Sequence, residues 1–104
     1  MKKLHEIETR NGYRVDLLNY MYNPAHGYEY PALVKSVSET ENEITKRRIY
    51  YMKFWDGSGA YEVETYTGKK NGDTWQLVNT IEKKVIEANN RFNLNKLIQL
   101  AETI

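Results

Sequence analysis

Residues 44–66 read ITKRRIYYMKFWDGSGAYEVETY, and two runs rich in β-branched and aromatic side chains flank a turn of small and polar residues. This pattern predicts two antiparallel strands joined by a four-residue loop at 56–59. The predicted pairs on the apolar face are Trp55 with Ala60, Phe54 with Tyr61, Met52 with Val63, and Tyr50 with Thr65. The predicted pairs on the solvated face are Lys53 with Glu62 and Tyr51 with Glu64. Because residues 49–55 are apolar on both faces, we expect this strand to be central.

A second hairpin is predicted around the dipeptide Asn11-Gly12, which favours tight turns. A two-residue turn would pair Ile7 with Asp16 and mix apolar with polar side chains. A three-residue loop, 10–12, with Gly12 in the left-handed conformation avoids this. The resulting pairs are Thr9 with Tyr13, Ile7 with Val15, and His5 with Leu17. The strands expected before residue 44 are 3–9, 13–20 and 32–38.

After residue 72 the spacing of apolar side chains changes from two to about 3.6 residues, which predicts helices. Asp73 is in position to cap a first helix over 73–88, whose apolar stripe consists of Trp75, Val78, Ile81, Val85 and Ala88. A second helix is expected from Asn93, with an apolar face of Leu94, Leu97, Ile98 and Ala101.

These elements predict one α+β domain spanning residues 1–104. Its first part, 1–68, holds about five antiparallel strands, arranged as two hairpins and a linking strand. Its second part, 73–104, is helical. We expect one or two C-terminal helices to pack on one face of the sheet and to bury its apolar side chains.

The composition excludes several classes of protein. The chain is 40% hydrophobic and 28% charged, with a net charge of +1, so it is neither disordered by composition nor strongly basic. It has no cysteine, and therefore no disulfide and no thiolate metal site. No apolar run is long enough to cross a bilayer, and charges at the start leave no room for a signal-peptide core. These features favour a cytoplasmic protein.

The segment 20–31 holds four tyrosines and both prolines, and is predicted to be a connecting loop. Tyrosine gives a large contact area with few torsions to freeze, while Asn and His add adaptable hydrogen bonds. The candidate partner-binding residues are Tyr20, Tyr22, His26, Tyr28 and Tyr30, with charged support from Arg47 and Lys53. The alternative is that some of these rings close the open end of the core.

A second hypothesis is a protein that binds single-stranded nucleic acid or nucleotides, because basic and aromatic residues lie close together after residue 46. The candidate residues are Arg47, Arg48, Tyr51, Trp55, Lys69 and Lys70. Strand alternation weakens this hypothesis, since Arg47 and Arg48 must point to opposite faces. The chain also lacks the motifs of RRM and KH domains.

A third hypothesis is a small nuclease or other hydrolase, with His26 and Glu29 as an acid–base pair and Arg47 or Arg48 as the cation. The chain contains no catalytic, phosphate-binding or metal-binding motif. We therefore expect no enzyme activity, no cofactor and no metal site.

Elimination favours a non-catalytic protein that binds another protein. Small motif-free proteins of this kind are common in phages and mobile elements, where they inhibit or modulate a larger host or defence complex. A homodimer through the C-terminal helices is also expected, because a small sheet leaves apolar residues uncovered. The residues in this surplus are Leu77, Ile86, Leu97, Leu100 and Ile104.

Overall fold

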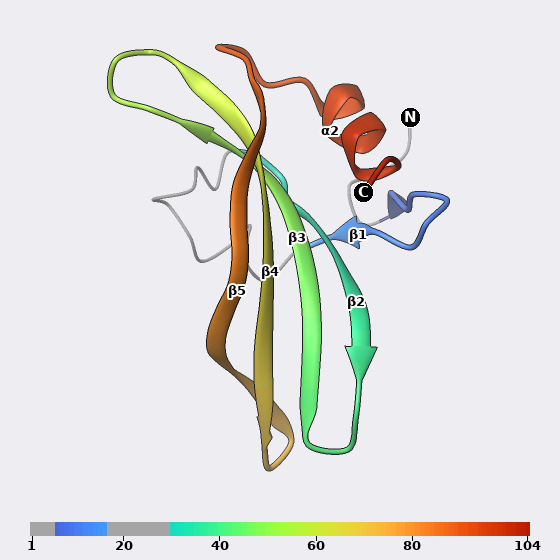
Figure 1. Ribbon diagram of the computed structural model, residues 1–104. Helices are drawn as coiled ribbons and strands as arrows, with labels where there is room; N and C mark the ends of the chain where they lie inside the picture. The colour runs from blue at the N-terminus through green and yellow to red at the C-terminus, as the bar shows by residue number, and fades with distance from the viewer. Residues whose placement is uncertain (1–5, 17–29) are drawn as a thin grey trace.

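The computed structural model describes residues 6–16 and 30–104, which form a five-stranded antiparallel sheet with one C-terminal helix packed against it (Figure 1). The elements are β1 (Arg14–Val15), β2 (Leu33–Glu39), β3 (Glu43–Lys53), β4 (Gly59–Asn71), β5 (Thr74–Ala88) and α2 (Leu94–Ala101). The strand order β1-β2-β3-β4-β5 follows the chain. The predicted α+β class and the central position of β3 are confirmed.

The first hairpin has the predicted register. The N–H of Thr9 donates to the carbonyl of Tyr13 at 2.9 Å, and Gly12 has a φ of 99°. A bridge between Glu8 and Arg14 continues the same pairing. Its strands are shorter than predicted, since β1 has 2 residues. Residues 1–5 and 17–20 lie outside the described part, and so does the predicted pair of His5 with Leu17.

The hairpin of β3 and β4 forms, but its predicted register is wrong by three residues. On the face that α2 covers, Ile49 pairs with Val63 and Tyr51 with Tyr61. The pairs on the second face are Tyr50 with Glu62 and Arg48 with Glu64, in place of the predicted Lys53 with Glu62 and Tyr51 with Glu64. The observed register therefore brings two tyrosines together in the core and places the two glutamates beside an arginine and a tyrosine.

The loop at 54–58 explains this shift. One carboxylate oxygen of Asp56 accepts both the N–H of Ser58, at 2.9 Å, and its hydroxyl, at 2.6 Å. The N–H of Phe54 donates to the carbonyl of Ser58 at 2.8 Å, and Gly57 has a φ of 88°. Because these bonds hold Phe54 and Ser58 inside the loop, the ladder starts at Gly59 rather than after it.

Residues 74–88 form strand β5, so the predicted helix over 73–88 is wrong and only the end of the 73–104 region is helical. Three residues of β5 have no partner in the β4–β5 ladder: Val78, Ile81 and Ile86. Each of these bulges shifts the alternation by one residue. Apolar side chains then recur three or four residues apart, which imitates the period of a helix. Asp73 lies in the two-residue turn between the strands and caps no helix.

The second predicted helix is confirmed as α2. The side chain of Asn93 caps it, because its Oδ1 accepts the N–H of Lys96 at 3.0 Å. Leu97 and Ala101 are fully buried against the sheet. The amide of Asn11 donates to the carbonyl of Ala101 at 2.8 Å, which joins the end of the helix to the first hairpin.

The hydrophobic core lies between α2 and one face of the sheet, which we call the helix face. Its buried residues are Tyr13, Val15, Leu33, Ile49, Tyr51, Tyr61, Val63, Leu97 and Ala101. Ile86, Leu100 and Ile104, expected to form an apolar surplus, pack against this core. Dimerisation through the C-terminal helices stays a prediction. It has less support, because these three residues already pack against the core of the same chain. In the described part of the chain, no helix is long and apolar enough to span a membrane.

Candidate functional site

The Tyr-rich loop falls mostly outside the described residues. This applies to Tyr20, Tyr22, His26 and Tyr28. Tyr30 is described, and its ring packs edge-on against Tyr51, with centroids 5.2 Å apart, and against Phe92 at 5.0 Å. Tyr30 is half-buried and therefore contributes to closing the core, which was the alternative considered for this loop.

Arg47 and Lys53, the charged support predicted for partner binding, both make contacts on the helix face. Arg47 donates from Nε to Thr65 at 3.2 Å and from a terminal nitrogen to the carbonyl of Ile104 at 3.3 Å. Lys53 donates to the carbonyl of Asn90 at 2.7 Å. Arg47 thus ties the end of the chain to the sheet, whereas Lys53 is exposed and lies next to the 54–58 loop.

The residues predicted for nucleic-acid binding do not come together. Tyr51 is fully buried, whereas the relative exposure of Trp55 is 106%. Lys69 and Lys70 lie near the β4–β5 turn, at the opposite end of the hairpin from the loop that carries Trp55 (Figure 1). Arg47 and Arg48 point to opposite faces, as predicted, and both have partners. The geometry therefore gives no continuous basic and aromatic surface among these residues.

Arg48 is the centre of a charged cluster on the second face of the sheet. Its guanidinium lies 2.7 Å from a carboxylate oxygen of Glu64 and 3.9 Å from one of Asp16. It also lies over the rings of Tyr50, at 5.4 Å, and Tyr66, at 5.5 Å. The side chains of Arg48, Asp16 and Glu64 are at most 13% exposed. Their charges are therefore stabilised mainly by neighbouring protein groups rather than by water.

Two tyrosines in this cluster have perturbed acidities. The Tyr50 hydroxyl donates to Glu62 at 3.0 Å, and both side chains are buried. Burial, followed by the charge of Glu62, raises the pKa of Tyr50 well above its usual value. Burial and the charge of Asp16 also raise the pKa of Tyr66. Both phenols are protonated at neutral pH, and Tyr50 acts as a hydrogen-bond donor to Glu62.

The 54–58 loop presents the most exposed aromatic surface of the described chain. Trp55 is fully exposed and Phe54 is 41% exposed. The bonds between Asp56 and Ser58 hold the loop in one conformation, and the hydrogen bonds from Ser58 lower the pKa of Asp56. An indole in water at the tip of an ordered turn is a common anchor in protein interfaces.

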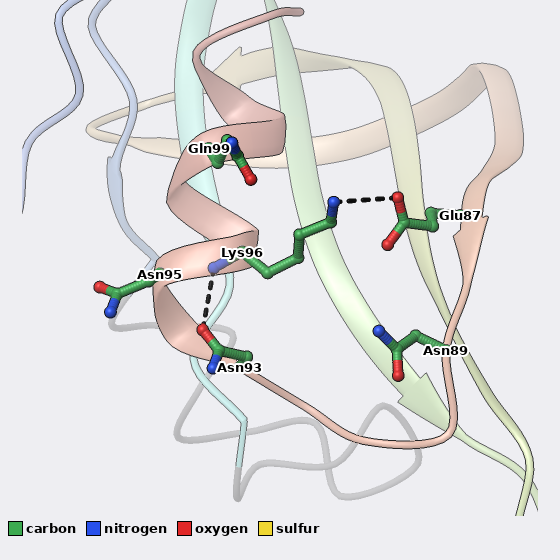
Figure 2. A pocket seen from close by; sticks show the side chains of 6 residues that line it. All are labelled: Glu87, Asn89, Asn93, Asn95, Lys96 and Gln99. Atoms are coloured by element: carbon green, nitrogen blue, oxygen red, sulfur yellow. Dashed lines mark hydrogen bonds and ion pairs between the residues drawn. The ribbon is translucent and has the colours of Figure 1, made fainter.

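A shallow groove of about 630 Å³ lies between α2 and the end of β5. Four carboxamide side chains line it, together with a lysine and a glutamate: Asn89, Asn93, Asn95, Gln99, Lys96 and Glu87. Figure 2 shows Lys96 reaching across the groove to Glu87, at 3.1 Å. The N–H of Asn89 donates to the carbonyl of Gly59 at 3.0 Å, so this polar groove adjoins the base of the 54–58 loop.

The structure does not test the hydrolase hypothesis, because the hypothetical acid–base pair of His26 and Glu29 lies outside the described residues. Within 6–16 and 30–104, no group of three or more His, Asp or Glu could hold a metal ion. The described chain presents an exposed indole, a groove lined by carboxamides, and a charged cluster on the sheet.

The 54–58 loop is not predicted as a separate surface from the sequence. The pattern of residues 44–66 predicts a strand that includes Phe54 and Trp55, with Trp55 as a candidate for stacking on nucleic acid. The Asp56-Gly57-Ser58 run was the available signal, because Asp followed two residues later by Ser favours a turn closed by side-chain hydrogen bonds. An aromatic pair immediately before such a turn is expected at its tip.

Known proteins give no further guide: no family model matches the chain, and neither a curated protein nor a solved structure matches it.

Proposed function

We propose that the protein is a non-catalytic module that binds another protein, with Trp55 as the anchor of the interface. The observation that carries the proposal is the complete exposure of this side chain at an ordered loop. Exposed large apolar side chains are unfavourable in water, and tryptophan is enriched among the residues that dominate binding energy. The partner we propose is a larger host or defence complex, which the protein inhibits or modulates.

The fixed conformation of the loop also supports this proposal. Flexible groups lose conformational entropy when they bind, so a loop that is already ordered gives up less of its binding free energy. Here the backbone is fixed by hydrogen bonds of 2.8 Å, from Phe54 to Ser58, and 3.1 Å, from Gly57 to Phe54. The adjoining carboxamide groove supplies a polar rim, as found around the apolar centre of many interfaces.

The charges around Trp55 favour a protein over nucleic acid. Asp56 is in the same loop and is ionised near neutral pH, as aspartate usually is, and the hydrogen bonds from Ser58 lower its pKa further. Lys53 is the nearby cation, and it already donates to the carbonyl of Asn90. A stacking platform for single strands combines aromatic rings with a positively charged groove. A carboxylate beside the indole opposes that arrangement.

The test is affinity capture of the tagged protein from bacterial lysate after nuclease treatment, with Trp55→Ala as the variant. Val37→Ala is the matched control, because Val37 is 45% exposed on β2, away from the loop. We expect a stoichiometric protein to bind the wild type and the control but not Trp55→Ala. Equal capture by all three, or capture of nucleic acid alone before nuclease treatment, would contradict the proposal.

A further inference from the structure

The outer edge of β2 is only partly covered by β1. Figure 1 shows β1 beside the upper end of β2, which continues well beyond it. Arg14 pairs with Val34 and Val15 with Leu33, whereas β2 extends to Glu39. A strand edge without a neighbour presents backbone donors and acceptors to whatever lies beside it.

Ser36 is the first residue on this edge that β1 does not reach. The N–H of Asp16 donates to the carbonyl of Ala32 at 2.8 Å, so Ala32 and alternate residues after it turn their backbone groups toward β1. Ser36 belongs to this set. If the register of β1 and β2 continued, Gly12 would lie opposite Ser36. The N–H of Gly12 instead donates to the carbonyl of Thr9, at 3.1 Å, within the turn.

A groove of about 470 Å³ follows this edge. Its lining includes Arg14, Ser36 and Lys46 from the second face of the sheet, and Lys35 from the helix face. Because the groove takes side chains from both faces of β2, it runs over the strand edge itself rather than over one face. An occupant of the groove can therefore reach the backbone of Ser36.

The groove is strongly basic. Three of its seven lining residues are cations, and none is an acid. Lys46 has no ion-pair partner among the described residues. Arg14 makes an exposed 3.5 Å ion pair with Glu8, a kind that contributes little in water. Lys35 donates to the carbonyl of Asn11 at 3.2 Å.

We propose that this groove binds an acidic, extended segment of a partner protein. The segment's backbone pairs with the outward N–H and C=O of Ser36, while its alternate Asp or Glu side chains reach Arg14 and Lys46. Strand addition of this kind takes affinity from main-chain hydrogen bonds and selectivity from the side chains alongside. Among the described residues the sheet ends on its other side at β5, which carries both Glu82 and Lys83 and therefore selects neither sign of charge.

This inference does not depend on Trp55. Lys46 and Lys53 are seven residues apart on β3, which corresponds to about 23 Å at the usual rise of a strand. The groove and the 54–58 loop are thus separate surfaces. Loss of Trp55 should leave binding at the groove unchanged, so the two proposals fail independently.

The test uses a fluorescein-labelled peptide of about eight residues with alternating Glu and Val, long enough to form a strand. Binding is measured by fluorescence anisotropy, with Arg14→Glu and Lys46→Glu as variants. Arg14→Gln and Lys46→Gln serve where the charge reversal disturbs folding. Lys83→Glu is the matched control, because it makes the same change on an exposed residue of β5.

We expect the peptide to bind the wild type and the control alike, and each groove variant to weaken binding by about tenfold, with smaller losses for the Gln variants. A peptide N-methylated along one edge should also bind less well, because it lacks the strand-pairing donors. Three results would overturn the proposal: no binding, equal loss in Lys83→Glu, or tighter binding of a single-stranded oligothymidylate, which would make the groove a phosphate site.

Discussion

The hydroxyl of Tyr51 donates a 2.8 Å hydrogen bond to the carbonyl oxygen of Asn89, directly over the Cα of Gly59. The bond links the central strand to the segment that leads into α2. It is possible only because residue 59 has no side chain: a Cβ there would overlap the Tyr51 hydroxyl and come within 2.8 Å of the Asn89 carbonyl.

Gly59→Ala should therefore destabilise the protein by about 1 to 3 kcal/mol, the usual effect of overpacking a filled site. Urea unfolding followed by circular dichroism measures the change. In a Tyr51→Phe background the same substitution should be less damaging, because the overlapping hydroxyl is gone. If the two substitutions change the free energy of unfolding additively, the steric explanation is wrong.

Arg48→Ala should lower the free energy of unfolding by about 3 kcal/mol, because it removes the cation that pairs with the carboxylates of Glu64 and Asp16 in a nearly buried site. Arg48→Lys should recover part of this loss, since it keeps the charge but not the guanidinium geometry. Lys70→Ala, on an exposed residue of β4 next to the β4–β5 turn, is the control and should change little. Similar effects for Arg48→Ala and the control would refute a structural role for the cluster.

Asn93→Ala should destabilise the protein by about 1 kcal/mol, because the N–H of Lys96 loses its capping acceptor. Asn95→Ala is the matched control within the same helix. Asn95 is exposed, and alanine has a higher helix propensity, so that variant should be neutral or slightly more stable. Thermal unfolding of the pair gives the comparison, and the reverse order would contradict the assigned cap.

Stability should fall as the pH rises above about 10, the ordinary pKa of tyrosine. Burial raises the pKa of Tyr13, Tyr50, Tyr51 and Tyr66 in the folded protein. In the unfolded chain these phenols ionise at their ordinary pKa, so the folded state then holds more protons. The stabilisation is complete below that pKa and is lost as the pH rises toward the folded values.

The measurement for this prediction is urea unfolding at several values between about pH 9 and about pH 11, with tyrosinate absorbance as a check. Tyr50→Phe should make the decline shallower, by up to about 1.4 kcal/mol per pH unit. A slope identical to that of the wild type would show that Tyr50 ionises equally easily in both states.

Much of the fold could be predicted from local signals. The turn at Gly12, the start of a helix at Asn93 and the apolar spacing of α2 each act within a few residues, and the structure confirms all three. The order of β2, β3 and β4 also follows from neighbouring runs of β-prone residues. In these places the local preference and the tertiary packing agree.

The errors arose where tertiary pairing alters a local pattern. The spacing of Val78, Ile81 and Val85 is that of a helix, and only the ladder with β4 shows that bulges produce it. Likewise, the register at Tyr51 depends on side-chain hydrogen bonds in a loop that was treated as a simple turn. The basic groove was missed because Arg14 and Lys46 are 32 positions apart and meet only through β2.

The strand order has a consequence for how the molecule acquires its structure. Every strand pairs with the one made just before it, so each hairpin of the meander can form as soon as its second strand has left the ribosome. The bonds from Asn11 to Ala101 and from Arg47 to Ile104, by contrast, join the C-terminal segment to much earlier parts of the chain. Closure of the core by α2 therefore comes after the strands are made, and the apolar helix face is open to solvent until it is complete.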